Sequence, residues 1–75
     1  MTQPWAAQVA DSLCHGAKVT FAKALTEAQE RLKSYAECLE GSKGSEDCGT
    51  EFRRLRTAQG SLETAAMQHR TFCRP

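Results

Sequence analysis

Large apolar side chains are scarce in this chain of 75 residues. It has no isoleucine, and leucine, valine and phenylalanine together supply 11 residues, as many as alanine alone. A chain this short, with so little large apolar surface, does not easily bury a core of its own. The net charge of +1 argues against a self-repelling disordered tail. We therefore expect cross-links, association with another chain, or both to supply the missing stability.

Several other features are absent, and each excludes a class of protein. No apolar run approaches the ~20 residues of a membrane-spanning helix. The first residues lack the basic start and apolar stretch of a secretory signal, and Asp11 precedes the first basic residue, Lys18, which is atypical of a transit peptide. No glycine-rich phosphate loop, Ser-His-Asp arrangement or C-x-x-C motif is found. We expect a protein that is not an enzyme, has no small-molecule substrate or cofactor, and meets membranes only indirectly.

Helical periodicity is present on both sides of one break, the glycine- and serine-rich segment 41–45. On each side, apolar or small residues recur every three or four positions, which is the pattern of a helix with one buried stripe. The expected stripe of the first helix is Trp5, Val9, Leu13, Ala17, Phe21, Leu25, Ala28, Leu32, Tyr35 and Leu39. That of the second helix is Cys48, Phe52, Leu55, Gln59, Leu62, Ala66, His69 and Cys73.

The predicted fold is all-α, an antiparallel two-helix hairpin that forms a single domain over residues 1–75. Its helices are predicted at about 4–40 and 46–73. Ser45 is the expected N-cap of the second helix, followed by two acidic residues in the first turn. Gly16 is the weakest position of the first helix, where a bend could occur.

The four cysteines test this hairpin. With a turn centred near residue 43, facing residues should have numbers that add up to about 86 or 87. The numbers of Cys38 and Cys48 add up to 86, and those of Cys14 and Cys73 to 87. Other pairings would have to bridge ~36 Å along a helix. The sequence therefore predicts the disulfides Cys38–Cys48 and Cys14–Cys73. The same rule pairs Tyr35 with Phe52, Leu32 with Leu55, Ala28 with Ala58, Phe21 with Ala66 and Ala17 with His69.

The surroundings of the inner cysteine pair carry a recognisable motif. Nine residues separate Cys38 from Cys48. The pattern resembles the coiled-coil-helix-coiled-coil-helix (CHCH, twin C-x9-C) family of mitochondrial proteins, and within it the small assembly factors and accessory subunits of respiratory complex I. The family's outer cysteines correspond to Ala28 and Ala58, so this chain departs from the pattern there. The matching positions are Tyr35, Cys38, Cys48, Glu51, Phe52, Leu55 and Arg56, with the acidic Asp47 beside the second cysteine.

The resemblance implies a structural or assembly protein of the mitochondrial respiratory chain, a complex I accessory subunit or assembly factor. It implies a location in the intermembrane space, in association with the inner membrane, and a larger protein complex as partner. Proteins of this family commonly enter that space without a presequence and are trapped by oxidation. Aromatic and aliphatic residues beside a docking cysteine guide that step, and Tyr35, Phe52 and Leu55 fit the role. They equally fit a hairpin core.

Candidate partner-binding residues lie at the N-terminus and in one arginine cluster. Trp5, Val9 and Leu13 extend past the expected end of the second helix, and an aromatic anchor such as Trp5 is typical of interface hot spots. Arg53 and Arg56, three residues apart on a helix, suit an acidic protein partner.

Three other interpretations remain open. Arg53, Arg54 and Arg56 could contact rRNA in a mitoribosomal CHCH-type protein, although a solvated helix face is the more ordinary role for such arginines, and nucleic acid is not the favoured partner. The chain could also be a secreted helical hairpin that binds a receptor. A zinc site made by Cys14, His15, His69 and Cys73 is disfavoured because adjacent helical residues point ~100° apart, so no metal is expected.

Overall fold

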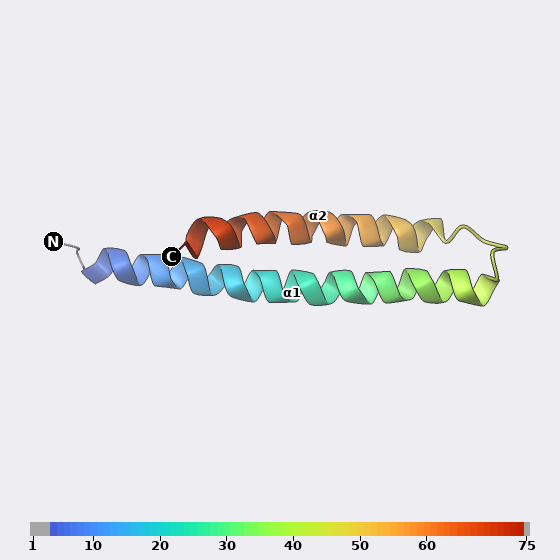
Figure 1. Ribbon diagram of the computed structural model, residues 1–75, viewed down its shortest axis with the longest axis horizontal. Coiled ribbons are helices and arrows are strands. Elements are labelled where there is room, and N and C mark those ends of the chain that lie inside the picture. Colours follow the sequence, from blue (N-terminus) through green and yellow to red (C-terminus); the bar gives the residue numbers. More distant parts are fainter. Residues whose placement is uncertain (1–3, 75) are drawn as a thin grey trace.

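The computed structural model describes the backbone of residues 4–74 and the side chains of residues 11–74. It contains two helices, α1 (Pro4–Ser42) and α2 (Gly49–Phe72). They lie side by side and antiparallel in a rod with extents of 65 × 16 × 13 Å (Figure 1). This confirms the predicted all-α hairpin. In the described part of the chain, neither helix is apolar enough over a sufficient length to cross a membrane.

Both predicted disulfides are confirmed, and each one joins α1 to the α2 side of the hairpin. Cys38 is bonded to Cys48 beside the turn, with 6.0 Å between their Cα atoms. Cys14 is bonded to Cys73 at the open end, with 4.9 Å between their Cα atoms. The covalent links therefore hold the two helices in register at both ends of the part where they overlap.

The core between these links is built mainly from alanine. Among the residues with described side chains, seven apolar residues are buried: Ala17, Ala24, Ala28, Cys48, Leu55, Ala58 and Ala65. Alanine has almost no side-chain entropy to lose and lets two helices approach closely, but it buries little apolar area. The predicted facing pair Ala28 and Ala58 is part of this core, with both residues less than 9% exposed.

The buried stripe of α1 agrees with the predicted one at Ala17, Phe21, Ala28, Tyr35 and Leu39, which are buried or half-buried, and differs at the positions between them. Leu25 and Leu32, predicted for the seam, are 39% and 55% exposed, and the smaller or half-buried side chains of Ala24 and Arg31 lie there instead. The cysteines impose this phase because both of them must face α2. The observed seam of α1 runs through Cys14, Ala17, Phe21, Ala24, Ala28, Arg31, Tyr35 and Cys38.

The seam of α2 is as predicted at six of its eight positions. Cys48 and Leu55 are buried, and Leu62, Ala66, His69 and Cys73 are half-buried, as expected. Phe52 and Gln59 are exposed, however, while Ala58 and Ala65 are buried. The buried seam of α2 therefore alternates between Leu55, Leu62 and His69 on the one hand and Ala58 and Ala65 on the other, at intervals of three and four residues.

The turn is longer than predicted, because α2 begins at Gly49 and not at about residue 46. The helix starts at Gly49 because Cys48 has the left-handed backbone conformation, with φ 54°, which cannot belong to a right-handed helix. The Asp47 carboxylate accepts a hydrogen bond of 3.0 Å from the Gly49 N–H. The predicted N-cap at Ser45 is wrong, because the Ser45 hydroxyl donates instead to the Ser42 carbonyl at the end of α1.

Two helical glycines are positions where the protein can be stabilised. Helix α1 runs unbroken through Gly16, and neither Gly16 nor Gly60 has an atom within 4 Å of the place where a Cβ would stand. We predict that Gly16→Ala and Gly60→Ala each raise the free energy of unfolding by about 0.5–1 kcal/mol, measured by urea denaturation. Gly44→Ala is the matched control and should lower it, because Gly44 has φ +83°. A Gly60→Ala variant that is no more stable would contradict the prediction.

The two disulfides should differ in their contribution to stability. The Cys14–Cys73 bond closes a separation of 59 residues and the Cys38–Cys48 bond one of 10. In the chain-entropy model, replacing both members of the outer pair with serine costs about 4 kcal/mol, and replacing the inner pair about 3 kcal/mol. Denaturant unfolding of the two double variants measures this. A larger loss from the inner pair would contradict the entropic account.

Candidate protein-binding surfaces

One face of the hairpin is apolar. Leu25 and Leu32 lie seven residues apart on α1, next to the line of the half-buried Phe21 and Tyr35. The Tyr35 ring lies 5.5 Å from the ring of Phe52, which places that residue of α2 on the same face. Leu62, half-buried, lies on α2 between Phe52 and the open end. We call this surface the leucine face; it consists of Phe21, Leu25, Leu32, Tyr35, Phe52 and Leu62.

Two aromatic contacts hold the leucine face across the seam. The predicted pairing of Tyr35 with Phe52 is confirmed by their rings. The Phe21 ring lies 5.6 Å from the ring of His69, whereas the predicted neighbour of Phe21 is Ala66. Side chains on a helix lean toward its N-terminus, so in an antiparallel pair these two rings lean toward each other. The rings of Phe21 and His69 therefore meet although their backbone positions are offset by about one helical turn along the hairpin.

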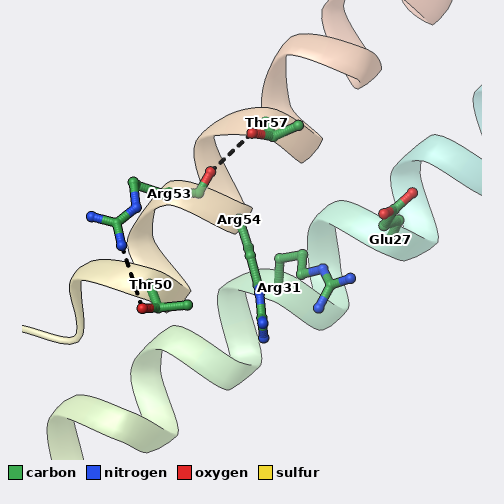
Figure 2. Close-up of a pocket in the computed structure, with 6 residues that line it drawn as sticks. All are labelled: Glu27, Arg31, Thr50, Arg53, Arg54 and Thr57. Carbon is green, nitrogen blue, oxygen red and sulfur yellow. Dashed lines mark hydrogen bonds between the residues drawn. The ribbon is translucent and has the colours of Figure 1, made fainter.

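The opposite face is polar and carries a shallow groove, shown in Figure 2. Its guanidinium groups come from both helices, with Arg31 from α1 and Arg54 reaching across from α2. Arg53 donates a hydrogen bond of 3.4 Å to the Thr50 hydroxyl. Within the part of the chain that has described side chains, the one ion pair within 4.0 Å joins Lys33 and Glu37, outside this group. The groove is lined by Glu27, Arg31, Thr50, Arg53, Arg54 and Thr57.

The structure does not bring the predicted arginine cluster together. Arg53 and Arg54 belong to the polar groove. The Arg56 guanidinium instead lies 5.9 Å from the centre of the Phe52 ring, a cation–π distance, on the leucine face. Arg53 and Arg56 therefore lie on different surfaces. Arg31, which the sequence pattern does not single out, lines the polar groove together with Arg53 and Arg54. No sequence signal marked Arg31, because its neighbours in space come from the other helix.

The predicted N-terminal binding residues lie where α1 extends beyond α2. Helix α2 ends at Phe72, just before the outer disulfide, so residues 4–13 of α1 project past it (Figure 1). Trp5 and Val9 lie on this extension, outside the residues whose side chains are described. Leu13 is 47% exposed at its base. Phe72 is 40% exposed and lines a second shallow groove with Leu13; sequence reasoning missed it.

The histidines and cysteines do not form the alternative zinc site. Cys14 and Cys73 are bonded to each other, and the ring of His69 lies tilted against the ring of Phe21. In the described part of the chain, one group has the reach of metal ligands, namely Cys38, Cys48 and Glu46. Because the two sulfurs of that group are joined in a disulfide, only the Glu46 carboxylate keeps a free ligand atom.

Comparisons with protein-family models, with curated proteins and with solved structures find no match to this chain.

Proposed function

We propose that this protein is a non-enzymatic helical hairpin of the mitochondrial intermembrane space that docks onto a larger protein complex. Respiratory complex I is the first candidate, with the chain acting as an accessory subunit or assembly factor. The hairpin offers shallow grooves on a thin rod, with extents of 16 and 13 Å across its axis, which suits binding between proteins better than enclosure of a small substrate.

The observation that carries this proposal is the extension of α1 beyond the end of α2. Residues 4–13 continue a helix for about 15 Å beyond the outer disulfide, where α2 has ended. Trp5, Val9 and Leu13 recur every four positions in the sequence, which is the spacing of an apolar stripe on a helix. An amphipathic helix that continues past the end of the helix it packs against is suited to insert into a groove of another protein.

The mitochondrial part of the proposal is supported by the resemblance to the CHCH family. The inner disulfide Cys38–Cys48 bridges the base of a helical hairpin, as in that family. The rings of Tyr35 and Phe52, tilted at 48° to each other, come from positions that resemble those which family members use next to a docking cysteine. The second disulfide lies farther out, at Cys14 and not at the family's outer position, and this is where the chain differs from the family pattern.

Replacing Trp5 tests the docking role. We expect the tagged chain to co-purify with complex I or its assembly intermediates from mitochondria, and Trp5→Ala to lower that recovery at least about fivefold, because a buried tryptophan is the usual interface anchor. Met67→Ala is the matched control, since Met67 is 67% exposed and belongs to α2 and not to the extension of α1. Recovery of the chain outside mitochondria, or equal recovery of complex I with Trp5→Ala, contradicts the proposal.

Contact with rRNA is a second candidate function, favoured by one observation. Arg31, Arg53 and Arg54 line one groove, and none of them forms an ion pair within 4.0 Å among the described side chains. Such guanidinium groups are free to meet phosphates. The acidic side chains of Glu27 in the groove and Glu51 nearby reduce the local charge, which keeps this role second.

The rRNA interpretation predicts a specific salt dependence. If it is right, the logarithm of the RNA-binding constant falls with the logarithm of salt concentration, and replacing both Arg53 and Arg54 with glutamine lowers the slope by about 1.4, at ~0.7 for each phosphate that is no longer neutralised. Arg56→Gln is the control and should leave the slope unchanged, because Arg56 lies over Phe52 on the other face. Filter binding at several salt concentrations measures this. Binding that is insensitive to salt, or to the double substitution, excludes the rRNA role.

A further inference from the structure

The leucine face is large enough to form an interface. Between the disulfides, from Cys14 to Cys38, α1 runs for about 36 Å at ~1.5 Å per residue. The rod is 16 Å wide. The side of the rod that carries the face therefore measures about 600 Å² on one chain, including the exposed Lys18 seven residues before Leu25, and two such sides would bury at most about 1,200 Å², at the lower bound of specific protein interfaces. Leu32 and Phe52 stand in it at 55% and 41% exposure.

The charges beside this face follow a regular pattern on α2. Arg56 borders the face over Phe52, and Glu63 and Arg70 follow at intervals of seven residues, so the three lie along one line. Seven residues span about 10 Å, too far for Arg56 and Glu63 to pair within their own helix. Within the described side chains, neither takes part in an ion pair. The corresponding border of α1 carries Ala22, Gln29 and Ala36, which are uncharged.

We propose that the leucine face binds the leucine face of a second copy of this chain, with α2 antiparallel to α2 of the other copy and α1 antiparallel to α1. The twofold axis is perpendicular to the helices. The point midway between Arg56 and Glu63 is residue 59.5, and the point midway between Cys48 and Cys73 is residue 60.5. Full overlap about residue 60.5 sets Arg56 of each copy opposite residue 65 of the other, two residues from Glu63, and moving the axis by one residue brings Arg56 opposite Glu63.

The same axis gives a compatible packing along α1. In the hairpin, position 59.5 of α2 lies opposite position 27 of α1, because facing residue numbers add up to 86 or 87. Antiparallel pairing about position 27 sets Leu32 of one copy against Ala22 of the other, and Leu25 against Gln29. Each leucine thus meets an uncharged side chain, and the small Ala22 leaves room for Leu32 to insert as a knob. The dimer goes beyond the docking role proposed above and uses other residues, since the extension at residues 4–13 lies outside the overlap.

The mass of the full-length oxidised chain in solution tests the dimer. We expect sedimentation equilibrium from about 10 µM to about 1 mM to show a monomer–dimer equilibrium. Leu32→Glu should weaken dimerisation by about tenfold or more, because it places a charge in the centre of the interface. Met67→Glu is the matched control, since Met67 is more exposed than Leu32 and lies off the face. Circular dichroism checks that both variants keep their helices.

A charge exchange tests the register. Arg56→Glu and Glu63→Arg should each weaken the dimer about threefold to tenfold, because each creates two like-charge contacts across the twofold axis, and the double variant should regain most of the lost affinity. A chain that stays monomeric up to about 1 mM overturns the proposal, and this includes a monomer whose leucine face binds a different protein. Dimerisation unaffected by Leu32→Glu also overturns it, and failure of the double variant to recover overturns the antiparallel register. None of these outcomes depends on whether the chain docks onto complex I.

Discussion

The covalent register between the two helices is the constraint on which the rest of this structure depends. Alanine supplies most of the buried seam, and its methyl group contributes little hydrophobic free energy on burial. Two helices joined only by such a seam could slide by a turn at small cost. The bonds at Cys14–Cys73 and Cys38–Cys48 remove that freedom. They also decide which side of α1 faces inward, and therefore which leucines remain outside.

The sequence was sufficient for the architecture and for the pairing of the cysteines, because both follow from periodicity and from equal arm lengths. It was insufficient for the phase of α1. Two stripes with intervals of three and four residues overlap in this helix, one containing Leu25 and Leu32 and the other Ala24 and Arg31. Hydrophobicity favours the leucines, whereas the covalent links select the second stripe. Extending the stripe outward from Cys14 in steps of three and four would have found it.

Local backbone geometry accounts for the other differences from the sequence-based expectations. The start of α2 depends on the left-handed conformation of Cys48, which propensity scales do not capture for a cysteine. The divergence of Arg53 from Arg56 depends on what each guanidinium meets, a threonine hydroxyl in one case and an aromatic ring in the other. Sequence spacing alone placed these two residues on one surface, because it does not describe where a long, flexible side chain ends.

The position of the outer disulfide has a mechanical consequence for the extension of α1. Cys14 stands at the point where the single helix becomes a pair. A pulling force applied to residues 4–13 by anything attached to them reaches this covalent bond before it reaches the alanine contacts behind it. The load passes into both helices together and cannot peel one from the other. Residues 4–13 can thus be pulled, bent or unwound while α1 and α2 keep their register beyond Cys14.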